Sequence, residues 1–147
     1  MSFKIEQDAA QAWSEVRDDK SDVNWVALGY DTSDSLKLVG KGTGGRAELI
    51  QHLGEDQMIY AAFRVFGTTG SGLDAKRVKF VGVNWVGPKT KPMIRARGSI
   101  HKNHVDKFFT GTHVTVSTGS LDDLSEDTIA KKLTGISGAH KVEAYEF

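Results

Sequence analysis

The sequence predicts an α/β fold in which a five-stranded mixed sheet lies between helices. Segments with the apolar pattern of strands occur in pairs joined by short polar or glycine-rich links, and segments with helical periodicity separate these pairs. The chain has 147 residues, of which 39% are hydrophobic and 26% charged, which suits one domain with a substantial core. No linker, repeat or low-complexity run divides it. We therefore expect one domain over residues 1–147, with its core at about residues 3–133 and a tail at 134–147.

Each expected element follows from a local pattern. Apolar residues at helical spacing predict a first helix that begins at Ile5 and ends near residues 18–21. Aromatic and β-branched runs predict strands, and Pro88 opens the longest helical pattern. After the first helix we expect a pair of strands at 23–30 and 36–39 and then a short helix at 46–53. A second pair of strands follows at 58–66 and 79–86, joined through the glycine-rich link 67–72. The remaining elements are a helix at 88–109, a strand at 113–117 and a last helix that runs from a capping box at Ser120 to Leu133. Residues 135–147 show no clear pattern.

Composition excludes several classes of protein. The absence of cysteine removes disulfides, thiolate metal sites and cysteine nucleophiles. No apolar run approaches the roughly 20 residues that a membrane-spanning helix needs. The first ten residues are polar and acidic, unlike a signal peptide, and Ser2 stands where myristoylation requires glycine. We therefore expect a cytoplasmic protein without a transmembrane segment.

The stretch GKGTGG, residues 40–45, has the spacing of a dinucleotide-binding fingerprint. Such a fingerprint belongs to a parallel strand–helix–strand unit, whereas strand 36–39 is the second strand of a predicted hairpin. The acidic residue expected about 20 positions later would fall in MIYAAFRVF, which has none. No Gly-Lys-Ser or Gly-Lys-Thr ending makes it a phosphate-binding P-loop. We interpret the stretch as a cramped strand-to-helix turn, and we expect no cofactor.

The residues that usually carry catalysis or bind metals form no recognisable set. His101 and His104 are three positions apart on the long helix, but no HExxH motif or third ligand accompanies them, and His104 is expected to be a half-buried histidine. No serine lies in a GxSxG elbow. The acidic residues at 122–127 open a predicted helix, where they complement the helix dipole. We expect neither a catalytic site nor a metal site.

Charge is strongly segregated along a chain whose formal net charge is zero. Residues 76–107 carry nine basic side chains and a single acidic one, Asp106, for a net charge of +8. A neutral protein with one concentrated basic segment has a polarised surface that suits an acidic partner. This segment is therefore the candidate binding region.

The long helix is expected to be amphipathic. Its sheet-facing side is predicted to contain Met93, Ala96, Ile100, His104 and Phe108. The opposite side would carry a basic stripe of Lys91, Arg95 and Lys102, in which Gly98 would let a partner approach the backbone. Lys76, Arg77 and Lys79, at the start of the preceding strand, form a second basic cluster that is close in sequence.

The loop KRVKF running into the strand VGVNWVG resembles the coactosin branch of the actin-depolymerising-factor homology family. Three further segments are similar: AWSEVRDDKSDVNWVALGY, GKGTGGRAELIQHL and SEDTIAKKL. The resemblance covers residues 5–133. It implies the fold of that family, a five-stranded mixed sheet between helices. It also implies filamentous-actin binding without enzymatic turnover, weak or no binding of monomeric actin, and opposition to barbed-end capping more than severing.

The resemblance also implies which residues contact the filament. Lys76, Arg77 and Lys79 would form the cluster in the basic loop, and Lys91, Arg95 and Lys102 would act from the long helix, although a proline stands near the family's Lys-Met helix start. Lys131 and Lys132 on the last helix are further candidates. Two alternatives stay open. The same basic face could bind phosphoinositides or nucleic acid, although the segment has few aromatics free for base stacking, and the glycine loop could serve a small-molecule enzyme.

Overall fold

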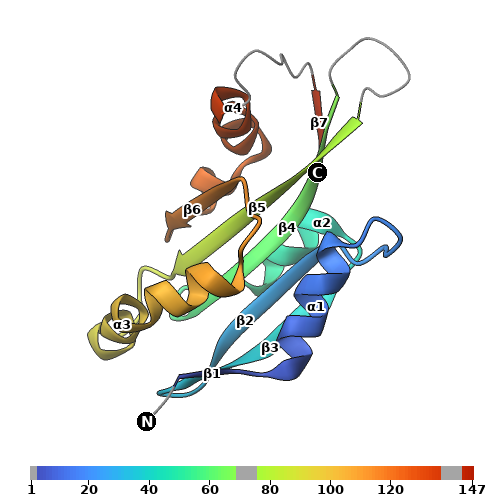
Figure 1. Ribbon diagram of the computed structural model, residues 1–147. Coiled ribbons are helices and arrows are strands. Elements are labelled where there is room, and N and C mark those ends of the chain that lie inside the picture. The colour runs from blue at the N-terminus through green and yellow to red at the C-terminus, as the bar shows by residue number, and fades with distance from the viewer. Residues whose placement is uncertain (1–2, 69–75, 137–143) are drawn as a thin grey trace.

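The computed structural model describes residues 3–68, 76–136 and 144–147. Residues 69–72 of the predicted glycine link and residues 137–143 of the predicted tail, His140 among them, lie outside this part of the chain, as does the side chain of Lys76. The predicted fold class is confirmed, because one mixed sheet has helices on both faces (Figure 1).

The sheet has seven strands among the described residues, ordered β1-β3-β2-β4-β5-β6, with β7 paired to β4. β1 is parallel to β3 and β6 is parallel to β5, whereas the β2–β3, β2–β4, β4–β5 and β4–β7 pairs are antiparallel. The five predicted strands are present, and the short β1 and β7 are additional. The strands are β1 (Lys4–Ile5), β2 (Trp25–Thr32), β3 (Ser35–Gly42), β4 (Met58–Thr68), β5 (Lys76–Val86), β6 (Val114–Thr118) and β7 (Ala144–Glu146).

The helices cover the two faces of the sheet in pairs. α1 and α3 pack on one face, and α2 and α4 pack on the other (Figure 1). Their bounds are α1 (Gln7–Arg17), α2 (Gly45–Leu49), α3 (Pro92–Phe108) and α4 (Glu126–Ile136), with 3-10 turns η1 (Ile50–His52) and η2 (Leu121–Leu124). α3 begins at Pro92 rather than at residue 88, because proline is tolerated in the first turn of a helix. α4 begins after Ser125, whose hydroxyl accepts a hydrogen bond from the Thr128 amide, so the capping serine is Ser125 and not Ser120.

The central strands are buried on both faces, which explains their continuous apolar runs. In β4, Ile59, Ala61, Phe63 and Val65 face the core under α2 and α4, while Met58, Tyr60 and Ala62 face α1 and α3. The same alternation places Arg64 on the α1 face, where it is 8% exposed. Its guanidinium donates hydrogen bonds to the backbone oxygens of Val16, Asp18 and Ser21. Arg64 thereby caps the carboxyl end of α1 and ties the following loop to the sheet.

Candidate functional site

Two of the predicted basic residues, Arg77 and Lys79, lie at the outer end of the β4–β5 hairpin. Arg77 pairs with Gly67 and Lys79 with Val65 across the two strands. These two residues are two positions apart on one strand, so their side chains leave the same side of the hairpin. Arg77 is exposed and Lys79 half-buried, and neither has an ion-pair partner among the described residues. At Arg77 and Lys79 the hairpin therefore presents positive charge without an ion-pair partner in the described part of the chain.

His113, at the start of β6, lies next to this cluster. Its ring nitrogen Nδ1 accepts a hydrogen bond from the Phe80 amide at 3.0 Å. Burial lowers the pKa of His113, and the positive charge of Lys79 lowers it further. The imidazole is consequently held in its neutral form near neutral pH, and the charge of this part of the surface comes from Arg77 and Lys79.

The long helix α3 docks on the sheet through a face that the sequence did not predict. Gly98, His101 and Val105 are buried, whereas Met93 and Ile100 are 72% and 74% exposed. The prediction that Met93, Ala96, Ile100 and His104 face the sheet is therefore wrong, and all four are exposed. A Cβ on Gly98 would collide with Met58 and would lie 3.1 Å from the Tyr60 hydroxyl, so this glycine lets the helix approach the sheet and does not serve a partner.

His101 accounts for the rest of this docking face. Its Nδ1 lies 3.0 Å from the Tyr30 hydroxyl, and its Nε2 lies 3.9 Å from a carboxylate oxygen of Asp34. The ring of Phe3 stacks on His101, with centroids 4.2 Å apart, and Tyr60 touches Tyr30 from β4. Burial lowers the pKa of His101, which Asp34 opposes, and burial also raises the pKa values of Tyr30 and Tyr60. A histidine with such partners can replace an apolar residue on a buried helix face.

The three predicted basic residues of α3 differ in what they contact. Lys91 precedes the helix and has no ion-pair partner in the described part of the chain. Arg95 folds back, and its guanidinium donates to the backbone oxygens of Gly87, Pro88 and Thr90. Lys102 forms an ion pair with Asp106, with Nζ 2.9 Å from the carboxylate oxygen. Of the three, Lys91 is the residue whose charge is most available to a partner.

The two basic groups are not brought together. Arg77 lies near the start of β5, and α3 follows the far end of that strand (Figure 1). β5 has 11 residues, so at about 3.3 Å per residue roughly 30 Å separates its ends. The basic residues of the hairpin and those of α3 are close in sequence, but the length of β5 separates them. They therefore form two distinct surface regions and not one. Lys131 and Lys132 are exposed on α4, and Lys131 forms an ion pair with Asp127.

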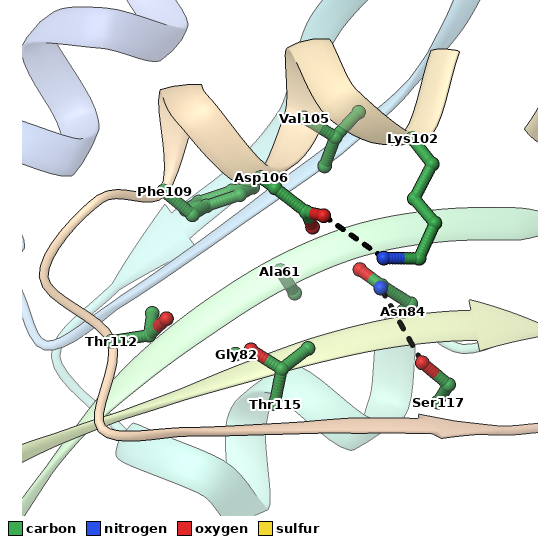
Figure 2. Close-up of a pocket in the computed structure, with 10 residues that line it drawn as sticks. All are labelled: Ala61, Gly82, Asn84, Lys102, Val105, Asp106, Phe109, Thr112, Thr115 and Ser117. Carbon is green, nitrogen blue, oxygen red and sulfur yellow. Dashed lines mark hydrogen bonds and ion pairs between the residues drawn. The ribbon is translucent and has the colours of Figure 1, made fainter. Parts of the chain in front are cut away.

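A hollow of about 360 Å³ lies between α3 and strands β5 and β6 (Figure 2). Small residues, Ala61 and Gly82, leave space at its base, and Lys102 and Asp106 reach over it from the helix. The Asn84 amide is 3.4 Å from the Ser117 hydroxyl. In the described part of the chain the ionisable side chains that line this hollow are Lys102 and Asp106, which form an ion pair with each other.

The described residues contain neither a cluster of metal-ligating side chains nor a membrane-spanning helix. Within residues 3–68, 76–136 and 144–147, no three histidine, aspartate or glutamate side chains are arranged to hold a metal ion. His101 is buried against Tyr30 and His104 is exposed, so the two do not converge as ligands. No helix in the described part of the chain is both long and apolar enough to cross a membrane.

Comparison with known proteins places the chain in a family. Residues 2–134 match the family of cofilin/tropomyosin-type actin-binding proteins, and the chain belongs to that family. It is 37% identical over 130 residues to coactosin from Dictyostelium discoideum, an alignment that covers 87% of this chain and 86% of the relative. The chain is therefore an actin-binding protein similar to coactosins.

Solved structures agree with this assignment. The crystal structure of coactosin from Entamoeba histolytica matches with a TM-score of 0.85 and 35% identity, covering 94% of this chain and 99% of that one. The solution structure of mouse coactosin, described as an actin filament binding protein, matches with a TM-score of 0.74 and 28% identity over 95% of each chain. The predicted resemblance is confirmed.

The exposed apolar residues on α3 are the part of the candidate site that sequence reasoning missed. Hydrophobicity assigned Met93 and Ile100 to the core. The spacing of Gly98, His101 and Val105, at positions i, i+3 and i+7, was the available signal for the true buried face. An exposed methionine and isoleucine on one helix face, next to a free lysine, are typical of a protein-binding surface.

Proposed function

We propose that this protein binds filamentous actin through two separate contacts. One contact is the exposed face of α3, with Met93 and Ile100 as apolar anchors and Lys91 beside them. The other is the outer end of the β4–β5 hairpin, with Lys76, Arg77 and Lys79. The observation that carries the proposal is the exposure of two large apolar side chains on α3, the helix that follows β5, together with a hairpin end at which Arg77 and Lys79 have no ion-pair partner among the described residues.

The two contacts have different physical roles. Apolar side chains that are about three quarters exposed lose most of their contact with water when a partner covers them, so the α3 face supplies affinity. Exposed basic side chains are each worth only about 0–1 kcal/mol, and they act mainly by accelerating encounter with an acidic surface. Contacts that lie toward opposite ends of β5 can engage two neighbouring subunits, which a filament offers and a monomer does not. This separation supports a preference for filaments over monomeric actin.

Arg95 and Lys102 have a smaller part in this proposal than the resemblance implied. The Arg95 guanidinium holds the loop before α3, and Lys102 is neutralised by Asp106. Filament binding at Lys91, Met93 and Ile100 does not require Arg95 to lose its hydrogen bonds or Lys102 to lose its ion pair. In this account Arg95 positions the start of α3, and Lys102 contributes at the margin of the contact.

Co-sedimentation with filamentous actin tests the proposal, at low and at physiological salt and with monomeric actin assayed alongside. Pelleting that weakens as salt rises, with little monomer binding, is the expected result. Neutralising Lys76, Arg77 and Lys79 together is expected to weaken pelleting without lowering the melting temperature. Absence of pelleting at low salt would overturn the proposal.

On this proposal the protein works on the cytoskeleton in the cytoplasm and modulates filament dynamics without turning over a substrate. Opposition to barbed-end capping is tested by adding the protein to filaments that grow in the presence of a capping protein. The expected result is faster elongation than with capping protein alone. The nucleic-acid alternative is less well supported, since the large apolar side chains exposed in the described residues are aliphatic and offer no base-stacking platform.

A further inference from the structure

The glycine loop that resembles a nucleotide-binding fingerprint has a neighbour within the chain. β3 ends at Gly42, and α2 begins at Gly45, whose φ of 63° lies in the left-handed region that favours glycine. A Cβ on Gly45 would lie 3.3 Å from the carbonyl carbon of Phe147. The last residue of the sequence therefore approaches the backbone of this turn closely.

Asn24 holds the turn in shape. Its side-chain oxygen accepts a hydrogen bond from the Gly45 amide at 2.8 Å, and its side-chain nitrogen donates to the Thr43 backbone oxygen at 3.0 Å. Both ends of the Asn24 amide are thereby used inside the loop. These two hydrogen bonds fix the shape of the turn, and Phe147 lies against it at Gly45.

The strand that leads to Phe147 lies against the basic hairpin. β7 pairs with β4 at Phe66–Thr68, where β2 no longer reaches, because the β2–β4 register ends at Phe63. The same three residues pair on their other side with Lys76–Val78. β7 thus adds a third strand to the part of the hairpin that carries the basic cluster, and Figure 1 shows it beside the outer ends of β4 and β5.

Two aromatic residues fasten β7 to the body of the protein. Tyr145 and Phe147 pack against the core on the face covered by α2 and α4. The Tyr145 hydroxyl lies 3.0 Å from the hydroxyl of Thr134 at the end of α4. β7 is therefore held at three places: the edge of β4, the end of α4 and the glycine turn.

We propose that β7 is a brace that sets the position of the basic hairpin, with Tyr145 and Phe147 as its positioning residues and the glycine turn as the surface against which Phe147 lies. A two-stranded ribbon is marginally stable in water, whereas a third strand and packing on a core suppress its twisting and bending. Arg77 then meets the filament already oriented, and less conformational entropy is lost on binding. This inference rests on the proposed function, in which the hairpin is one of the two contacts.

The test compares the wild-type chain with the double variant Tyr145→Ala/Phe147→Ala. Tyr145→Phe is the conservative control, because it keeps the ring on the core and loses only the hydroxyl contact, and Ala144→Ser is a control on an exposed position of the same strand. Amide hydrogen exchange of Phe66–Thr68 and Lys76–Val78 reports the brace without any actin. Filament co-sedimentation then reports its consequence.

For the double variant we expect exchange of these amides to become about tenfold faster or more, while exchange in the buried part of β4 stays unchanged. We expect its Kd for filaments to rise about fivefold, through the entropy of ordering a loose hairpin. Both controls should behave like the wild type. Unchanged hairpin exchange in the double variant would overturn the inference, as would faster exchange with an unchanged Kd.

The two proposals fail in different ways. A wild-type chain that does not pellet with filaments overturns the proposed function, and with it the consequence of the brace for actin. A wild-type chain that pellets, together with a double variant that pellets equally well, overturns only the role given to β7. Arg77→Ala completes the comparison, because it should weaken pelleting and leave hairpin exchange at the wild-type rate.

Discussion

Replacing Met93 and Ile100 by alanine should separate filament binding from folding. Their side chains are 72% and 74% exposed, so removing them takes little from the core. We expect the free energy of unfolding of Met93→Ala/Ile100→Ala to stay within about 0.5 kcal/mol of the wild type, as for most surface substitutions. The wild type and the double variant should therefore have nearly the same urea midpoint.

The expected loss of binding follows from the same exposure. Burial of apolar carbon contributes about 0.8 kcal/mol per CH₂ group, and truncation to alanine removes about three such groups from each side chain. With nearly three quarters of each side chain available to be covered, the loss is about 1.7 kcal/mol per residue. This corresponds to roughly a twentyfold rise in Kd for each substitution and about a 300-fold rise for the pair.

Co-sedimentation over a range of actin concentrations measures this effect. Val39→Ala is the matched control, since Val39 is an apolar residue 40% exposed on β3 and the substitution removes two methyl groups. We expect the control to bind like the wild type. The reasoning would be refuted if the double variant kept the wild-type Kd, or if it bound weakly only because it had unfolded.

Further predictions concern stability, pH and salt. Gly98→Leu should lower the free energy of unfolding by about 1–3 kcal/mol in urea titration, because the added side chain must displace Met58 under the helix; an unchanged midpoint would contradict the docking of α3. Arg64→Met should lower it by about 3 kcal/mol, since buried carbonyl oxygens at the end of α1 lose their donor, and a melting temperature equal to that of the wild type would count against the cap. Burial lowers the pKa of His101 in the folded state, so the unfolded state binds a proton first as pH falls; this contribution to stability is complete above the ordinary pKa of 6.5 and declines below it. Thermal melts between pH 5 and 7.5 should show a shallower decline in His101→Asn than in the wild type, and equal slopes would refute this role. Filament affinity should fall between low and physiological salt in the wild type and change less in the variant that lacks the three hairpin charges.

The order of elements could be predicted because the local patterns agree with the fold. The strands β4 and β5 have apolar side chains toward both faces, and their continuous runs predicted strands buried between helices. The context of the glycine loop, after the second strand of a hairpin, correctly predicted a strand-to-helix turn, but the predicted bounds were wrong: Gly40–Gly42 pair with β2 as part of β3, and only Thr43 and Gly44 lie between β3 and α2. In these cases local preference and tertiary packing point to the same structure.

The face on which α3 docks could not be predicted from hydrophobicity. Its buried positions include Gly98, which has no side chain to bury, and His101, whose burial depends on Tyr30 and Asp34, which are distant in sequence. Such residues appear polar or neutral in a hydrophobic pattern, whereas Met93 and Ile100 appear apolar and are exposed. If α3 contacts the filament as proposed, its apolar residues are exposed for a partner, which departs from the usual burial of apolar side chains.

The sequence pattern did not predict the strand β7, and the reason differs from that for α3. β7 has three residues, and its pairing partner is the edge of β4, nearly 80 positions earlier in the chain. A segment this short has no periodicity of its own, so its conformation comes from the edge that it joins. The separation of the two basic groups likewise depended on the direction and length of β5, which charge counting ignores.

Hydroxyl-radical footprinting of the protein on filaments is the most direct test of the two-contact account. Met93 is a strongly exposed and easily oxidised side chain on the proposed α3 contact, and Met58, which is 8% exposed beneath the helix, is an internal reference. The account predicts that filaments slow the oxidation of Met93 several-fold. They should also protect the hairpin residues at 76–80, while Met58 oxidation stays low with and without actin. Equal oxidation of Met93 in the free and filament-bound protein, at saturating actin, would contradict the account.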